Sequence, residues 1–200
     1  WGLINTSKAA EVISNTNFQN IIRENTLSNG TVQTLRVYSD GTSPLKATIC
    51  WADPAANPNA LTLNNRAPRL INDLDVRIYR EGTSDSIFPY RLDPANPANA
   101  ATTGDNVVDN VEQVLVNTPT AGYYIIRVSH KRNLQSNAAQ NYSMIVTGGN
   151  ANTLVLNNIP AFFKFGTTYT LPFTKTGTFG ANNAYTIEFI PPSGGNGVTA

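Results

Sequence analysis

Apolar and polar residues alternate with a period of two over most of the chain, a spacing typical of β-strands that bury one face. Residues 45–51 (LKATICW) give the clearest example, because one face collects the side chains of Leu45, Ala47, Ile49 and Trp51. Similar runs occupy residues 31–38, 74–79, 111–116, 122–130 and 141–148. Turn residues separate them, among them the pair Asn29-Gly30. Several short strands with such turns predict an antiparallel β-sandwich or jelly roll over residues 27–148.

Two segments depart from this period. Near the N-terminus, Asn5 or Thr6 can cap a helix that places Ala9, Val12 and Ile13 on one face and ends at Ser14-Asn15. It is the one helix that we predict. Long Pro- and Asn-rich stretches at 52–69 and 80–110 predict loops.

The organisation that follows has three parts. Residues 1–26 form a helix and exit segment, residues 27–148 the sandwich, and residues 149–200 a linker with a partial immunoglobulin-like β module. The run GGNAN at 148–152 predicts the linker by its composition. Because the sequence starts at Trp1 without Met, we interpret it as a piece of a longer polypeptide.

Composition removes several function classes. Charged residues make up 14% of the 200 residues and the net charge is +1, so no basic field indicates a nucleic-acid partner. No apolar stretch approaches the length of a membrane-spanning helix, so we expect no membrane insertion. The single cysteine, Cys50, can form no internal disulfide, and we expect it to be a small buried residue.

Five short motifs then occur in a familiar order. They read LKATICWADP, LINDLDVRIY, DNVEQVLV, TPTAGYYIIRV and NYSMIVTG, and WGLINTSKAA precedes them. This order resembles the end of the catalytic domain and the following β-sandwich of secreted bacterial subtilisin-like serine proteases. The third motif departs from that pattern, because Asp109 stands where the family has Asn. The run GTTYTLPFTKTGTFGANNAYTIEF resembles the start of an immunoglobulin-like module of secreted bacterial proteins.

The resemblance implies a non-catalytic accessory region of a secreted or cell-surface serine endopeptidase. Its partners would be the upstream catalytic domain and, through the parent enzyme, protein substrates. The region would stabilise that domain, with Ca²⁺ as a candidate cofactor, and aid substrate access. No catalytic triad is expected here: the GTS tripeptides at 41–43 and 82–84 lie in turns, and His130 in an exposed turn beside two cations.

The carboxylates Asp73 and Asp75 in LINDLDVRI share one face of a strand, opposite Leu74 and Val76. They could act as a catalytic acid pair, as calcium ligands, or as local hydrogen-bond and ion-pair groups, with Arg66, Arg69 or Arg77 as partners. The sequence leaves calcium and the structural role evenly balanced. The candidate calcium ligands are Asp53, Asp73, Asp75, Asp109 and Glu112, with further oxygens from Asn72, Asp93 and Asp105.

Other function classes stay open at this point. A carbohydrate- or surface-binding module would use an exposed platform of tyrosines, from among Tyr79, Tyr90, Tyr123 and Tyr124. A structural spacer would bind nothing. If a catalytic domain is missing, an exposed apolar patch (Leu3, Ile4, Val12 and Ile13) would favour a dimer of the fragment.

Overall fold

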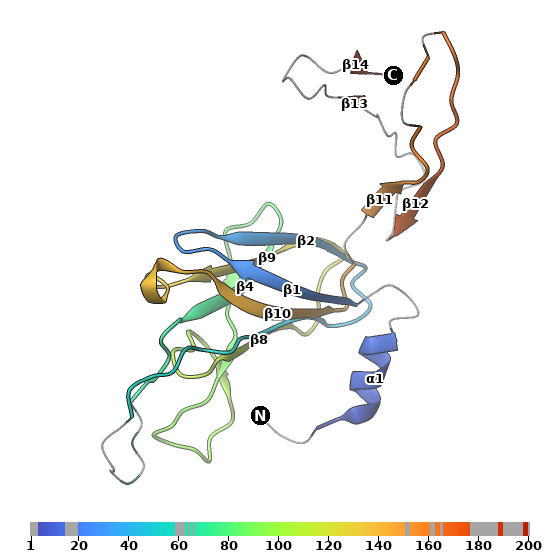
Figure 1. Ribbon diagram of the computed structural model, residues 1–200. Coiled ribbons are helices and arrows are strands. Elements are labelled where there is room, and N and C mark those ends of the chain that lie inside the picture. Colours follow the sequence, from blue (N-terminus) through green and yellow to red (C-terminus); the bar gives the residue numbers. More distant parts are fainter. Residues whose placement is uncertain are drawn as a thin grey trace.

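The computed structural model describes residues 4–14, 20–58, 63, 65, 67–150, 153–160, 163–164, 166–176, 188–189 and 198–199. Its centre is a sandwich of two antiparallel four-stranded sheets (Figure 1). Sheet A has the order β1-β10-β3-β8 and sheet B the order β2-β9-β4-β5. The strands of sheet A are β1 (Ile21–Leu27), β10 (Gln140–Thr147), β3 (Leu45–Cys50) and β8 (Val111–Val116). Those of sheet B are β2 (Gln33–Ser39), β9 (Gly122–His130), β4 (Leu74–Arg80) and β5 (Ser86–Ile87).

The connections between these strands make the sandwich a jelly roll. The chain passes from one sheet to the other at nearly every step, and the eight strands arrange themselves as two four-stranded sheets of Greek-key type. The predicted fold class, mainly β with one short N-terminal helix, is confirmed.

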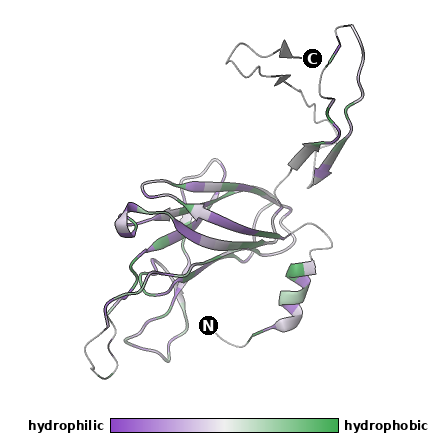
Figure 2. Ribbon diagram, viewed as in Figure 1, coloured by the Kyte–Doolittle hydropathy of each residue, from purple (hydrophilic) through white to green (hydrophobic). Residues whose placement is uncertain are grey.

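Alternation decides which side chains form the core between the sheets. On β3, Leu45, Ala47 and Ile49 are fully buried, and Trp51 just after the strand is 2% exposed. Figure 2 shows apolar and polar residues alternating along the strands. The expectation for Cys50 was wrong: it is exposed, because the same alternation puts it on the outer face of sheet A.

The helix α1 (Thr6–Ser14) begins and ends where the sequence predicts. The side-chain oxygen of Asn5 accepts a hydrogen bond from the backbone N–H of Lys8 at 2.9 Å, which satisfies one free amide of the first turn. None of the residues of α1 is buried, and Ile13 is 73% exposed. The helix therefore adds nothing to the core of the sandwich. Leu3, which the predicted apolar patch includes, lies outside the described residues.

Both boundaries of the sandwich differ from the sequence prediction. The first strand begins at Ile21 and not at residue 27, and it pairs with β10 along its whole length. At the other end, Asn150 forms an isolated bridge with Tyr38 of β2, through backbone hydrogen bonds of 2.8 and 3.0 Å. Gly148 has a positive φ of 74°, and a Cβ there would overlap the carbonyl oxygen of Pro44. Residues 148–150 are thus part of the sandwich, and the predicted linker does not begin at Gly148.

The long loops carry short strands of their own. The excursion after β4 holds β5 and the small hairpin β6–β7, with β6 (Tyr90–Arg91) paired to β7 (Thr102–Thr103). Past the sandwich, β11 (Thr153–Leu156) pairs with β12 (Phe173–Thr176), and β13 (Glu188–Phe189) pairs with β14 (Val198–Thr199). Residues 177–187 of the run GTTYTLPFTKTGTFGANNAYTIEF, which carries the resemblance to an immunoglobulin-like module, lie outside the described residues. Whether this region is an immunoglobulin-like module stays a prediction.

Candidate functional site: a buried carboxylate cluster beside a basic groove

The side chains of Asp73 and Asp75 lie on the face of β4 that points away from the core, yet they are only 5% and 6% exposed. Residues flanking β8 and β9 cover this face. The chain after β9 brings Lys131, and the segment before β8 brings Asp105. Every one of residues 72–78 is therefore buried, although they alternate between two faces.

Two cations hold these acids together. The Nη2 atom of Arg77 lies 2.7 Å from a carboxylate oxygen of Asp75 and 2.6 Å from one of Asp105. The ammonium nitrogen of Lys131 lies 3.3 Å from Asp73, 3.0 Å from Asp75 and 2.9 Å from Asp105. The acids thus form a network of charge-assisted hydrogen bonds.

Glu112 completes this network from the opposite sheet. It is fully buried on β8, and its Oε2 atom accepts a hydrogen bond of 2.7 Å from the backbone N–H of Val76 on β4. Arg77 lies 3.5 Å from the same oxygen. Because β5 pairs only with Ile78 and Tyr79, the Glu112 carboxylate bonds an edge amide of β4 that β5 leaves free. We call Asp73, Asp75, Arg77, Asp105, Glu112 and Lys131 the carboxylate cluster.

Burial controls the proton affinities in this cluster. It raises the pKa of Glu112 to about 8, with a further rise from the charge of Asp75, against the opposing effects of the Val76 amide and Arg77. Burial likewise raises the pKa of Asp73, although Lys131 opposes it. Burial also acts on the more exposed Asp105, but there the hydrogen bond and charge of Lys131 prevail and lower the pKa.

The structure places the predicted calcium ligands in two groups. Asp73, Asp75 and Glu112 belong to the carboxylate cluster, where Arg77 and Lys131 already supply the positive charge. Asp53 lies apart, and its two oxygens each accept a backbone N–H, from Ile71 and Asn72, at 2.8 Å.

The remaining predicted oxygens also bind the protein itself. Asp109 accepts a hydrogen bond from the side chain of Asn106, Asp93 accepts one from Asn96, and Asn72 bonds the backbone of Gln135 and the side chain of Gln140. Among the described residues, no group of three or more His, Cys, Asp or Glu side chains is arranged to hold a metal ion. The residues therefore do not fit a calcium ion, and a calcium site stays a prediction from the sequence.

A groove of about 570 Å³ opens directly beside the cluster. Asp73 and Lys131 line it on the cluster side. Two further cations, Arg69 and Arg132, also line it, and neither forms an ion pair with any of the described residues. The rest of the lining is mainly apolar and consists of Ala56, Pro68, Leu70, Ile71 and Val107, with Asn57. We call this hollow the basic groove.

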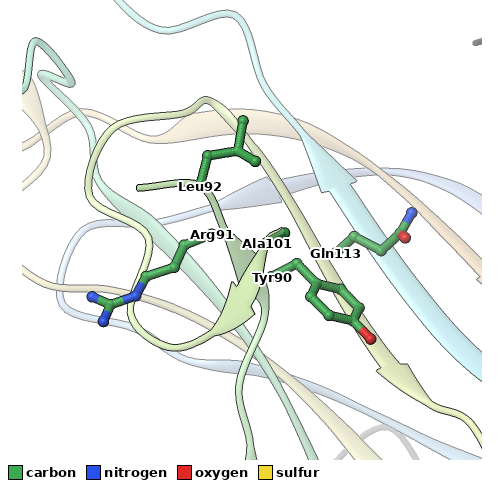
Figure 3. A pocket seen from close by; sticks show the side chains of 5 residues that line it. All are labelled: Tyr90, Arg91, Leu92, Ala101 and Gln113. Atoms are coloured by element: carbon green, nitrogen blue, oxygen red, sulfur yellow. The ribbon is translucent and has the colours of Figure 1, made fainter. Parts of the chain in front are cut away.

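A second, smaller pocket of about 360 Å³ lies between the β6–β7 hairpin and sheet A (Figure 3). Its lining residues are Tyr90, Arg91, Leu92, Ala101 and Gln113. Figure 3 shows the guanidinium of Arg91 directed away from the ring of Tyr90 and the amide of Gln113. The pocket thus offers mostly apolar surface and no convergent charge.

A serine-protease triad is not formed in the part of the chain that the structure describes. Ser43 and Ser84 are exposed and lie in the loops that follow β2 and β4. His130 is half-buried, and not an exposed turn residue as predicted. Its Nε2 accepts a hydrogen bond of 2.8 Å from the backbone N–H of Gly30, and its Nδ1 lies 2.6 Å from the carbonyl oxygen of Arg132. Both ring nitrogens are engaged by the backbone, so this chain is not itself catalytic in the serine-protease sense.

The four tyrosines do not form a flat platform. Tyr124 is 3% exposed and donates its hydroxyl hydrogen bond to the carbonyl of Thr120 at 2.9 Å. Tyr123 lies under the guanidinium of Arg36, whose carbon is 3.3 Å from the ring centre. Tyr90 sits on the β6–β7 hairpin. Tyr79 on β4 is half-buried, and its hydroxyl lies 3.5 Å from Nη1 of Arg127. The four tyrosines therefore do not share one exposed face, which a carbohydrate-binding platform would require.

No protein-family model matches the chain, and no curated protein matches it. Among solved structures, PliG of Salmonella Typhimurium, a periplasmic inhibitor of g-type lysozyme, is 15% identical with a TM-score of 0.35. The match covers 64% of this chain and 86% of that one. PliG of Aeromonas hydrophila, with the same description, is 11% identical with a TM-score of 0.34, over 64% and 85% of the two chains. At this level the lysozyme partner of those proteins is not transferred to this chain.

These findings overturn the resemblance to subtilisin-like proteases. Both of these solved structures are described as lysozyme inhibitors, and no family model or curated protein matches that would support a subtilase. The predicted accessory function and the upstream catalytic domain as partner are therefore wrong, and nothing in these comparisons supports the parent endopeptidase. The physical reason is that the motifs serve the fold: Asp53 caps a loop, Asp75 and Glu112 belong to the cluster, and Gly122 begins a strand. Such tasks arise in a sandwich of any function.

Sequence reasoning found most of the carboxylate cluster. It singled out Asp73, Asp75, Asp105 and Glu112 and named Arg77 as a partner. It missed Lys131 as the shared cation and the groove formed with Arg69 and Arg132. The one available signal was the pair Lys131-Arg132 directly after a strand that ends in His130.

Proposed function

We propose that the jelly roll is a non-catalytic protein-binding module, and that the basic groove binds an acidic, apolar-flanked segment of a protein partner. The observation that supports this most is the combination of two unpaired arginines with an apolar lining in one hollow of about 570 Å³. This volume lies within the usual range of ligand sites, roughly 300–1,000 Å³.

The chemistry of the lining favours a carboxylate over other anchors. Arginine presents a planar fork of donors that matches a carboxylate, and among the described residues Arg69 and Arg132 form no ion pair with an acid. Leu70, Ile71 and Val107 offer contact area for the apolar side chains that flank such a carboxylate. An extended peptide with acidic and apolar side chains would contact both the arginines and the apolar lining of the groove.

An extracytoplasmic location suits this proposal. The low share of charged residues and the sparing use of cysteine are compatible with a secreted or periplasmic β-protein. No helix in the described part of the chain is long and apolar enough to cross a membrane.

The test uses a defined peptide. We expect the N-acetylated, C-amidated peptide Leu-Asp-Leu-Asp-Leu to shift the methyl NMR signals of Leu70, Ile71 and Val107, and the Asn-for-Asp version of the peptide to bind much more weakly. Arg69→Glu and Arg132→Glu should each weaken binding by about tenfold or more, since each replaces attraction by repulsion. Arg91→Glu, at the other pocket, is the matched control. Equal effects of all three variants, or no methyl shifts at all, would overturn the proposal.

A further inference from the structure

Lys131 belongs to the basic groove and to the carboxylate cluster at the same time. Its ammonium group lines the groove, yet three carboxylates already hold it at 2.9–3.3 Å. Its side chain is 25% exposed, so it can reach solvent and a ligand without leaving the cluster. An anion that enters the groove therefore meets the ammonium group of Lys131, whose charge three carboxylates already compensate in part.

A continuous chain of contacts connects this lysine to Glu112. Lys131 contacts Asp75 at 3.0 Å, Asp75 contacts Arg77 at 2.7 Å, and Arg77 contacts Glu112 at 3.5 Å. One carboxylate oxygen of Glu112 accepts the Val76 amide, while the other, Oε1, is buried with no hydrogen-bond partner. Glu112 can thus take a proton on Oε1 and keep its bond to β4.

The cluster contains more acid than base. Four carboxyl groups, those of Asp73, Asp75, Asp105 and Glu112, face two cations, Arg77 and Lys131. Asp73, Asp75 and Arg77 come from β4 and its approach, Asp105 from the segment before β8, and Lys131 from the segment after β9. With every carboxyl ionised the cluster is negative, and its field opposes an anion in the groove.

We propose that anion binding in the basic groove is linked to protonation of the buried Glu112, so that an acidic ligand binds more tightly when Glu112 carries a proton. The proton removes one negative charge from the cluster and leaves more of the charge of Lys131 to the ligand. By linkage, a bound anion also increases the proton affinity of Glu112. This inference rests on the proposed function, because it describes how the same groove is regulated.

The experiment measures the Kd of the Leu-Asp-Leu-Asp-Leu peptide by methyl NMR titration at about pH 6.5 and about pH 9.5, on either side of the Glu112 transition near 8. The aspartates of the peptide stay ionised over this range. We expect the Kd of the wild-type protein to rise about three- to tenfold at the higher pH. Glu112→Gln should bind at both pH values with the affinity that the wild type shows at the lower one.

A second variant guards against a fold defect in Glu112→Gln. Asp105→Asn removes a carboxylate whose side chain is 44% exposed, so we expect tighter binding with the pH dependence retained. If the wild type and Glu112→Gln give parallel pH profiles, the linkage is wrong while the groove stands as a binding site. If the peptide shifts no methyl signal at any pH, the proposed function fails and the linkage fails with it.

Discussion

The two edges at which the sheets of the jelly roll meet are closed by different chemistry. At the edge formed by β1 and β2, neutral groups bridge the sheets: the hydroxyl of Tyr142 donates to Gln33 at 2.6 Å, and the amide of Gln33 donates to the carbonyl of Thr26 at 2.7 Å. At the opposite edge, where β8 of sheet A faces β4 and its short neighbour β5, the side chain of Glu112 bridges the sheets, within the carboxylate cluster.

This contrast separates two ways of stabilising a sandwich. Neutral hydrogen bonds contribute modestly to the free energy of unfolding, and this contribution does not depend on pH near neutrality. The contribution of a buried bridge between titratable groups depends on their protonation, and removing one partner strongly destabilises the fold. The β8–β4 edge therefore carries the pH response of the fold, and the basic groove lies beside that edge.

The largest effect should come from breaking the charged edge. Arg77→Met leaves the buried Asp75 and its neighbour Asp105 with less compensation, and we expect a loss of about 3–5 kcal/mol in the free energy of unfolding. Urea unfolding at neutral pH measures it. Arg36→Met is the control, because the pair of Arg36 with Glu81 is about half exposed and screened by solvent, so its loss should be much smaller. Equal losses in the two variants would remove the distinction between buried and exposed pairs.

The next effect concerns pH. Burial raises the pKa of Glu112 from 4.5 to about 8, so the folded state holds the proton more tightly than the unfolded chain. Its contribution to stability is fully present below about pH 4.5 and is lost as the pH rises through about 8. Between about pH 6 and pH 9 the loss should reach roughly 2–3 kcal/mol.

Glu112→Gln should lack this loss and should be more stable than the wild type at the upper end of that range. Chemical denaturation at a series of pH values compares the two proteins. Superimposable pH profiles would show that Glu112 is ionised throughout and that the edge is not proton-sensitive.

A smaller effect is expected at the neutral edge. Tyr142→Phe keeps the packed ring and removes only the hydroxyl that donates to Gln33, so the loss should be about 1 kcal/mol. It should be the same at about pH 6 and pH 8, since burial raises the pKa of the Tyr142 phenol further from this range. A pH-dependent loss would mean that the two edges are coupled after all.

The smallest effect should come from calcium. Arg77 and Lys131 already compensate the carboxylates, so we expect the melting temperature to be equal in EDTA and in millimolar CaCl₂. A shift of several degrees, abolished by Asp73→Asn with Asp75→Asn, would instead restore the calcium site that the sequence predicted.

Local periodicity predicted the strands wherever one face is wholly apolar. It located β3 and β9, and it placed Leu74, Val76 and Ile78 of β4 in the core correctly. It missed β1 because Arg23 and Asn25 interrupt the apolar positions of Ile21 and Leu27, a pattern that the pairing with β10 overrides. This strand therefore depends on its pairing with β10 more than on its local alternation of apolar and polar residues.

The candidate site shows the same limit more strongly. The period of two placed Asp73 and Asp75 together, since that follows from neighbouring positions on one strand. Their shared partner Lys131 lies 58 residues beyond Asp73, and no local pattern joins them. The groove needs the segments around Arg69, Val107 and Arg132 at once, which only the folded topology provides.

The bridge between Asn150 and Tyr38 has a mechanical consequence. The chain leaves β10 of sheet A, crosses over Pro44 at Gly148, and attaches to the outer edge of β2 in sheet B. Tension applied through the following strands would load these two backbone hydrogen bonds before it reaches the sheets. Asn150 also occupies part of the free edge of β2, which makes that strand a poorer template for aggregation. Residues 148–150, whose composition resembles a linker, therefore tie the end of β10 in sheet A to β2 in sheet B.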